Sequence, residues 1–410
     1  MKSVLLTVML LVAVGAAAQT NYYVSTSGSD ANDGSAARPW ATIGRASSAL
    51  VLGGGGAVVN VAPGSYGAVS TSRSGAASQP IVYKSTTKYG ARIASSGGSV
   101  WANTGAYVTI QDFEVTGSGN NCIGIITYSG NTQIVGNWVH DIPAPTSTCG
   151  DGTGGAAIDS YSSSNSMSSG NINTKIIGNV VDNVGSGATQ GCNNQHGIYV
   201  ASPLTLVQNN IVSRVCGMGI HIYHYTTNEV VTNNVVINNS EGGIQNTADG
   251  GVVCNDHSTV SNNIVANNGG LRGALSAGGI TELSGCTGSS NVYRNNILYG
   301  NSPNAIQYPH GARTESGTVV PSTAQFNALF VNYTGNAKTG DYRLNPASVA
   351  VDAGLSNVCA SGGITPCIAP TDFVGSVRPQ SGTLDIGAFE TGAVAASAPN
   401  PPTGLTATVQ

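Results

Sequence analysis

One short phrase recurs along this chain as Gln208-Asn209-Asn210-Ile211-Val212, Thr232-Asn233-Asn234-Val235-Val236, Ser261-Asn262-Asn263-Ile264-Val265 and Arg294-Asn295-Asn296-Ile297-Leu298. Three looser copies precede these four, and the aligned positions are 112, 137, 179, 210, 234, 263 and 296. Successive spacings are 25, 42, 31, 24, 29 and 33 residues. The shortest spacings match one coil of a parallel β-helix, and the longer ones match a coil with an inserted loop.

A second phrase, a small residue followed by Ile, accompanies each copy of the first. Its members are Gly124-Ile125, Ala157-Ile158, Gly197-Ile198, Gly219-Ile220, Gly243-Ile244, Gly279-Ile280 and Ala305-Ile306. Because successive side chains of a strand point to opposite faces, we expect each Ile to point inward and the next residue outward. The two phrases together predict an all-β solenoid.

The aligned Asn residues are predicted to form a ladder inside the coil at a tight bend. Asn tolerates the left-handed backbone conformation that such a bend needs, and stacked side-chain amides hydrogen-bond from one coil to the next. The rival interpretation is that these residues bind sugar. Inward Asn at turns is the commoner use in solenoids of this kind.

The N-terminus is typical of an exported protein. Met1-Lys2 is followed by an apolar run from Val4 to Val14 and then by small residues up to Ala18. This order of a basic start, a short apolar stretch and a cleavage site predicts a secretory signal peptide over residues 1–18. We therefore expect a secreted, extracellular protein without a membrane span.

The eight cysteines are expected to form disulfides, because export takes them into an oxidising space. Each local spacing is close to one coil length, so sequential pairing would staple neighbouring coils. The pairs predicted in this way are Cys122 with Cys149, Cys192 with Cys216, Cys254 with Cys286, and Cys359 with Cys367. A Cys/His metal site is the alternative, but no Cys-x-x-Cys spacing supports it.

The composition excludes one class of partner. Charged residues make up 8% of the chain and the net charge is −4, and no basic stretch could follow a phosphate backbone. Nucleic acid is therefore not an expected partner. We expect a monomer.

Four regions follow the signal peptide. Residues 21–106 form an N-terminal cap with the first coils, and an Ala-rich stretch from Ala41 to Leu50 is predicted to be a capping helix. Residues 107–310 are the repeat array, and residues 311–390 are an irregular closing segment. Residues 391–410 are a linker followed by a stretch that resembles the first strand of a fibronectin-type domain.

The chain resembles the secreted right-handed parallel β-helix proteins of bacteria, the pectate-lyase-like superfamily. The motifs that carry the resemblance are Tyr22-Tyr23-Val24, Pro39-Trp40-Ala41-Thr42-Ile43, Asp341-Tyr342-Arg343-Leu344 and Asp385-Ile386-Gly387-Ala388-Phe389-Glu390. They are specific for the architecture and poorly specific for chemistry. The resemblance implies a right-handed parallel β-helix that binds, and often cleaves, acidic polysaccharides along its outer surface.

A dense cluster of His and Tyr marks the middle of the array. If the strands align as predicted, Asp159, Tyr199, His221 and Gln245 form one outward line across adjacent strands, roughly 4.8 Å apart. His196, Tyr161, Tyr223, His224 and Tyr225 lie in or beside the same two or three coils. A solvated outer face with aromatic contacts between strands would also explain these residues.

The residues suit cleavage of a uronate-containing glycan by β-elimination. Such a reaction needs a base for the C5 proton, an acid for the leaving oxygen and a partner for the carboxylate. We assign His196 or His221 as base, Tyr199 or Tyr223 as acid, and Arg214 with Asp159 to the carboxylate or a cation. Tyr161, His224, Tyr225 and Gln245 are assigned to substrate binding.

Calcium is the one cofactor that this assignment suggests, held by Asp159. The sequence lacks the clustered Asp with Lys or Arg that many β-helix lyases use, and it lacks the polygalacturonase and epimerase motifs. Two alternatives to a lyase therefore stay open. One is a non-catalytic extracellular protein that binds glycans, and the other is a glycoside hydrolase or epimerase on the same fold.

Overall fold

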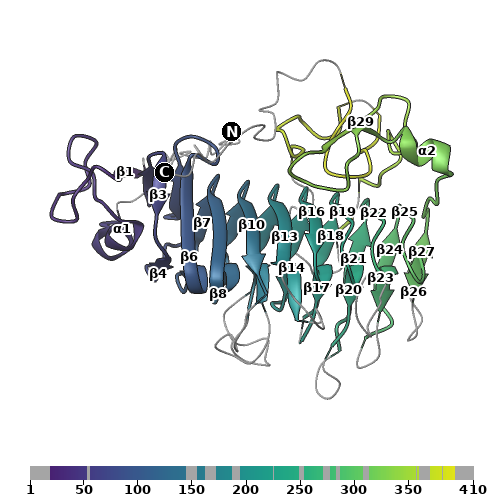
Figure 1. The fold of residues 1–410 in the computed structure, drawn as a ribbon, viewed down its shortest axis with the longest axis horizontal. Helices are drawn as coiled ribbons and strands as arrows, with labels where there is room; N and C mark the ends of the chain where they lie inside the picture. The colour runs from purple at the N-terminus through teal and green to yellow at the C-terminus, as the bar shows by residue number, and fades with distance from the viewer. Residues whose placement is uncertain are drawn as a thin grey trace, which may run out of the picture.

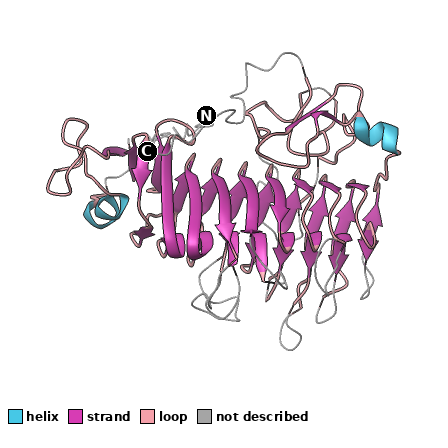
Figure 2. Cartoon of the chain, viewed as in Figure 1, coloured by secondary structure: helices cyan, strands magenta, loops and turns pink. Residues whose placement is uncertain are grey.

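The computed structural model describes residues 19–52, 56–144, 155–161, 172–186, 194–224, 226–248, 254–270, 278–282, 287–307, 314–356, 358–359, 370–380 and 382–392. The predicted signal peptide and nearly all of the predicted linker lie outside these ranges. Within them the regular secondary structure is almost entirely β-strand, joined by loops (Figure 2). Parallel strands stack coil on coil and confirm the predicted right-handed parallel β-helix.

The first face of the helix is one continuous parallel sheet. Its order follows the chain from coil to coil, so every neighbour in the sheet belongs to the next coil. The strands are β1 (Thr20–Val24), β2 (Ala57–Val61), β5 (Ile81–Ser85), β7 (Val108–Gln111), β9 (Gln133–Val135), β12 (Lys175–Ile177), β15 (Leu206–Gln208), β18 (Val230–Thr232), β21 (Thr259–Ser261), β24 (Val292–Arg294) and β27 (Thr314–Ser316).

Two long strands, β6 (Ala91–Asn103) and β8 (Glu114–Thr127), belong to both the second and the third face. The short strands β3 (Gly64–Tyr66) and β4 (Val69–Thr71) both pair with β6. The second face contains β10 (Trp138–Pro143), β13 (Val180–Ser186), β16 (Ile211–Val215), β19 (Val235–Ile237), β22 (Ile264–Ala266) and β25 (Ile297–Tyr299). The third face contains β11 (Gly155–Asp159), β14 (Gln195–Val200), β17 (Met218–Ile222), β20 (Gly242–Asn246), β23 (Gly278–Glu282) and β26 (Ile306–Gln307).

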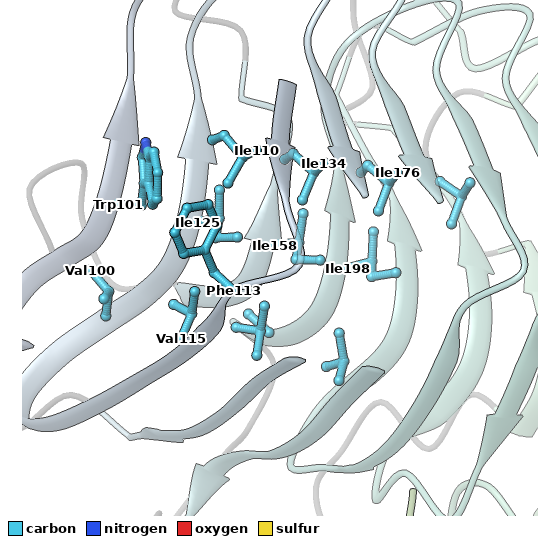
Figure 3. Close-up of a cluster of buried hydrophobic side chains, with 14 of the residues drawn as sticks. Val100, Trp101, Ile110, Phe113, Val115, Ile125, Ile134, Ile158, Ile176 and Ile198 are labelled. Atoms are coloured by element: carbon cyan, nitrogen blue, oxygen red, sulfur yellow. The ribbon is translucent and has the colours of Figure 1, made fainter. Parts of the chain in front are cut away.

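The interior is a stack of aliphatic columns. The Ile residues of the second phrase stand in register on adjacent strands of the third face, as the sequence predicts, at positions 125, 158, 198, 220, 244, 280 and 306. Figure 3 shows Ile125, Ile158 and Ile198 facing Ile134 and Ile176 of the first face. Each fully buried Ile contributes about 1.5–3 kcal/mol relative to exposure.

The Asn ladder is present and buried. Oδ1 of Asn210 accepts hydrogen bonds from the backbone N–H and from Nδ2 of Asn179, at 2.9 and 3.0 Å. Nδ2 of Asn210 donates to Oδ1 of Asn234 at 2.9 Å and to the carbonyl of Ile176 at 2.9 Å. The same pattern runs from Asn137 to Asn296. These residues are scaffold, which confirms the structural interpretation of the repeat.

The bend itself is made by the residue before each ladder Asn, so the conformational part of the prediction is wrong. Asn209 and Asn233 take the positive φ values, 57° and 55°. The first repeat was also misaligned by one residue. Asp112 is the left-handed residue there, with φ 64°, and Phe113 stands at the ladder position because its N–H donates to Oδ1 of Asn137 at 3.0 Å.

A second, shorter ladder was not predicted. Asn239, Asn268 and Asn301 stack at the corner between the second and third faces, with Nδ2 to Oδ1 distances of 2.8 and 3.0 Å. Their spacings repeat those of the first ladder, 29 and 33 residues. This shared period is the signal that could have found them.

A capping helix lies at the N-terminal end of the β-helix, and the closing segment lies along the second face. Helix α1 (Ile43–Ala49) begins at Thr42, whose side chain caps it, and it buries Ile43 and Ala46 against the first coils. The closing segment carries helix α2 (Thr323–Asn327) and the antiparallel pair β28 (Phe330–Asn332) and β29 (Asp341–Leu344). No helix in the described ranges is long and apolar enough to cross a membrane.

The closing segment covers the outer side of the second face from β16 onward, as Figure 1 shows. Its aromatic residues, Phe326, Phe330 and Tyr342 among them, pack on outward apolar side chains such as Val235 and Ile264. A buried ion pair, Arg378 with Glu390 at 2.6 Å, lies within this segment. The third face lies away from this cover.

We expect Asn234→Ala to destabilise the fold strongly. The substitution removes the acceptor of the Asn210 amides and the donor to Asn263, and each buried group left unsatisfied costs about 1–3 kcal/mol. Urea unfolding of the full chain measures the loss. The matched control is Asn327→Ala, an exposed Asn at the end of α2. Equal stability of the two variants would contradict a supporting role for the ladder.

Candidate functional site

The predicted line of outward residues exists. Asp159, Tyr199, His221 and Gln245 stand opposite one another on β11, β14, β17 and β20. Their chain neighbours Ile158, Ile198, Ile220 and Ile244 belong to the interior core. The line therefore lies on the outer side of the third face, at the register that the sequence predicted.

Gly197 explains how His196 reaches the same outer side. A Cβ on Gly197 would lie 2.4 Å from the carbonyl oxygen of Gly219 and 2.7 Å from Val212 Cγ1, so this position points inward and admits no side chain. Strict alternation would place His196 inside with Ile198. The ring of His196 instead stacks on Tyr199, with centroids 5.0 Å apart and planes 12° apart.

Asp159, His196 and Tyr199 border a cavity of about 220 Å³. The described part of its lining carries the polar side chains of Asp159, Tyr161, Asn194, His196, Tyr199, Tyr223 and His224, and it includes no Lys or Arg. Asp159 is the one carboxylate among them. The cavity thus combines imidazole, phenol and amide groups with a single acidic residue.

The two histidines His196 and His221 are in direct contact. Nε2 of His196 lies 3.3 Å from Nδ1 of His221, and the ring centroids are 4.5 Å apart. The remaining ring nitrogens, Nδ1 of His196 and Nε2 of His221, are buried and have no hydrogen-bond partner in the described part of the chain. Unsatisfied buried polar groups are rare in native proteins, and functional sites are one place where they occur.

Burial keeps both histidines neutral. Loss of solvation, with a smaller effect of the nearby His224, lowers the pKa of His196 to about 3. The pKa of His221 falls well below its usual range through burial first, and then through His196 and His224. An uncharged imidazole has one N–H and one lone pair, so each ring can donate one hydrogen bond and accept one.

Aromatic contacts hold the rest of the cluster together. Tyr223 lies 5.0 Å from His221, 4.5 Å from His224 and 6.3 Å from Tyr199, measured between ring centroids. Tyr161, further along the cavity, makes an edge contact with Tyr128 at 5.8 Å. Such contacts restrict the rotamers of the rings that border the cavity.

Arg214, Gln245 and His221 are not among the described lining residues of this cavity. Arg214 lies on the second face, where its Nε donates to Asp182 Oδ1 at 2.9 Å, so the expectation that it stands beside the histidines is wrong. The reason is that β16 and β17 belong to different faces, although they are close in sequence. Gln245 is buried in the predicted line but is not among the lining residues. Tyr225 lies outside the described residues.

The described residues at the cavity do not by themselves assemble a Ca²⁺ site, so the calcium that the sequence suggests stays a prediction. In the described ranges, no three His, Cys, Asp or Glu side chains are grouped to hold a metal ion. Asp159 is the single carboxylate of the lining that the structure describes, whereas Ca²⁺ takes six to eight oxygen ligands. We derive no role for a metal from this site.

The described cysteines are all bonded. Cys122, Cys216, Cys254 and Cys359 take part in disulfides. Their predicted partners, Cys149, Cys192, Cys286 and Cys367, lie outside the described residues, so the pairing stays a prediction.

A second polar cluster, on the second face, was missed by the sequence analysis. His140 Nδ1 lies 2.7 Å from Asp141 Oδ2, and its Nε2 lies 3.2 Å from Glu114 Oε1. Arg92 extends the network to Glu114 at 3.1 Å, and Trp138 stacks on His140 at 3.8 Å. Both ring nitrogens of His140 are engaged, so this histidine is a structural ion-pair partner. The residues of this cluster belong to three different coils, so they lie far apart in the sequence and form no local motif.

The sequence matches no protein-family model and no curated protein. Among solved structures, pectate lyase Pel9A aligns over 92% of this chain and 97% of its own, at 15% identity and a TM-score of 0.57. This chain has the parallel β-helix fold of that lyase.

Two further solved structures are similar at lower scores. The A-module of the Azotobacter vinelandii mannuronan C-5 epimerase AlgE4 aligns over 64% of this chain and 68% of its own, at 13% identity and a TM-score of 0.46. A rhamnogalacturonan lyase aligns over 69% of each chain, at 17% identity and a TM-score of 0.39. At these identities the likeness shows the fold alone.

His140 should make stability depend on pH. Burial opposes its charged form, but hydrogen bonds and charge from Asp141 and Glu114 outweigh burial and raise the pKa of His140 above 6.5. A raised pKa in the folded state means that the stabilisation is complete below about pH 6.5 and is lost as pH rises through the folded value. We expect His140→Gln to remove this part of the slope in urea unfolding measured from pH 5 to 9. The control is His257→Gln, whose side chain is 47% exposed; an unchanged slope in His140→Gln would contradict the assignment.

Proposed function

We propose that this protein is an exported polysaccharide lyase that cleaves a uronate-containing glycan at the cavity of the third face. The observation that carries the proposal is the buried, neutral His196 beside Tyr199 and Tyr223 on the outer side of the β-helix. A base and candidate acids thus border one open space. Export, which the N-terminal sequence predicts, would bring the site to extracellular polymers.

The chemistry needs no group beyond those of the lining and the substrate. His196 takes the C5 proton, the electrons of that bond form the C4–C5 double bond, and the C4–O bond breaks. A Tyr199 or Tyr223 hydroxyl donates its proton to the leaving oxygen. Because no Lys or Arg is among the described lining residues, hydrogen-bond donors such as the Asn194 amide take the role that was predicted for Arg214.

The low pKa of His196 fits a substrate that carries its own negative charge. A pKa of about 3 keeps the imidazole unprotonated, but it makes His196 a weak base in the empty site. An opposite charge within about 4–6 Å favours the protonated form of a histidine and raises its pKa. A uronate carboxylate that enters the cavity would therefore strengthen the base that acts on it.

The lining argues against hydrolysis. Most glycoside hydrolases use two carboxyl groups, one as acid and one as base or nucleophile. Among the lining residues that the structure describes, Asp159 is the single carboxylate, so this described set lacks the second group. Elimination by His and Tyr is the reaction class that the lining supports best.

We expect the purified protein to release unsaturated products, followed by ultraviolet absorbance, from at least one polymer in a panel of pectin, alginate and glycosaminoglycans. His196→Ala should lower kcat by on the order of 10²–10⁴-fold, the usual contribution of a general base. His257→Ala, which changes an exposed histidine with a side-chain exposure of 47%, should keep full activity. Tyr199→Phe and Tyr223→Phe identify the acid.

Three results would decide against the lyase. Binding to a polymer without any product would favour the non-catalytic glycan-binding protein. New reducing ends without ultraviolet absorbance would favour a hydrolase, and a changed uronate composition without cleavage would favour an epimerase. Each of these outcomes would overturn elimination as the reaction of this cavity.

The pH profile tests the role of the substrate charge. The acid limb of kcat/KM reports the free protein, and that of kcat reports the complex. If the bound carboxylate raises the pKa of His196, the acid limb of kcat lies at higher pH than that of kcat/KM. Coincident limbs would contradict activation of the base by substrate.

A further inference from the structure

His221 stands behind the cavity, in contact with the proposed base. It is buried and does not belong to the lining residues, whereas His196 does. The contact between the rings joins Nε2 of His196 to Nδ1 of His221 at 3.3 Å. Nδ1 of His196 is therefore the ring nitrogen of the proposed base that is buried at the cavity without a partner among the described residues.

The contact couples the tautomers of the two rings. If Nε2–H of His196 donates to Nδ1 of His221, the lone pair of His196 lies on Nδ1 and the proton of His221 lies on Nε2. If the donor is Nδ1–H of His221, His196 instead carries its proton on Nδ1. Only the first arrangement lets Nδ1 of His196 accept a proton.

The described neighbours of His221 favour its neutral form. It is flanked by Tyr199 on β14 and by Gln245 on β20, and by Tyr223 and His224 that follow β17. Asp159, two strands away on β11, is the carboxylate in the same line. The ring is thus a neutral hydrogen-bond partner rather than a second charge.

We propose that His221 is a positioning residue that accepts a hydrogen bond from Nε2–H of His196 and thereby keeps the lone pair of His196 on Nδ1, where the substrate proton arrives. The proposal deepens the lyase function and rests on it for its catalytic meaning. The hydrogen bond itself exists or fails independently of any substrate. His221 would then act through His196 without touching the glycan.

Nitrogen NMR of the full-length protein with ¹⁵N-labelled histidine tests the hydrogen bond without substrate. We expect His196 to be protonated on Nε2 alone, His221 to be unprotonated on Nδ1, and a ¹⁵N–¹⁵N coupling across the hydrogen bond. Spectra of His196→Gln and His221→Asn assign the signals. A proton on Nδ1 of His196, or on Nδ1 of His221, would overturn the proposal.

Two substitutions at position 221 separate positioning from packing. In His221→Asn the amide oxygen can replace Nδ1 as acceptor, whereas His221→Phe keeps an aromatic ring without an acceptor. We expect the Asn variant to hold His196 in the Nε2–H tautomer and to keep kcat within about threefold. The Phe variant should show both tautomers of His196 and lose on the order of tenfold or more in kcat at similar KM.

The outcomes distinguish this inference from the lyase proposal. If the predicted tautomer is found but no polymer is cleaved, the hydrogen bond stands and the lyase function fails. If polymer is cleaved but the Asn and Phe variants lose activity equally and His196 keeps one tautomer in both, His221 is a packing residue and the inference fails.

Discussion

The hydrogen bond from each ladder amide to the next is the interaction on which the rest of this structure depends. A parallel β-helix must turn sharply at every coil, and each turn removes backbone groups from the regular ladder of the sheet. Buried backbone N–H and C=O groups need partners. In this chain Asn210 and its equivalents supply both, since Oδ1 accepts from the coil before and Nδ2 donates to a backbone carbonyl. The preceding Asn makes the turn itself, with a positive φ.

This corner fixes the register of every strand that follows it. Once the ladder sets the position of Ile211 or Val235, the Gly-Ile phrase of the same coil falls on the third face at a defined height. A slip by one residue would exchange the buried and the outward columns. The line of Asp159, Tyr199, His221 and Gln245 is thus a consequence of scaffold contacts on another side of the molecule. The site residues stand at defined positions because each coil of the scaffold repeats the same strand register.

The two polar clusters of the outer surface use the histidine side chain for two different purposes. His140 lies between Glu114 and Asp141, and these carboxylates raise its pKa and so favour its protonated form. His196 and His221 contact each other and neighbouring aromatic rings, and burial lowers the pKa of both. The first arrangement stabilises the folded chain. The second leaves ring nitrogens unsatisfied beside a cavity, which is a cost to stability that binding of a ligand can offset.

The sequence by itself determined the coil, the inward Ile column and the outward line, because these follow from periodicity alone. It also led to His196, although strict alternation would have placed that ring inside. Gly197, whose Cβ-free position in β14 is pressed against Gly219 and Val212, breaks this alternation. The tertiary structure decided which residues of different coils and faces contact one another. It took Arg214 to Asp182 on the second face, brought Glu114 to His140 across 26 residues, and set His221 behind His196. Such contacts depend on how faces meet at corners and on which ring nitrogen points where, and a repeat period carries no information about either.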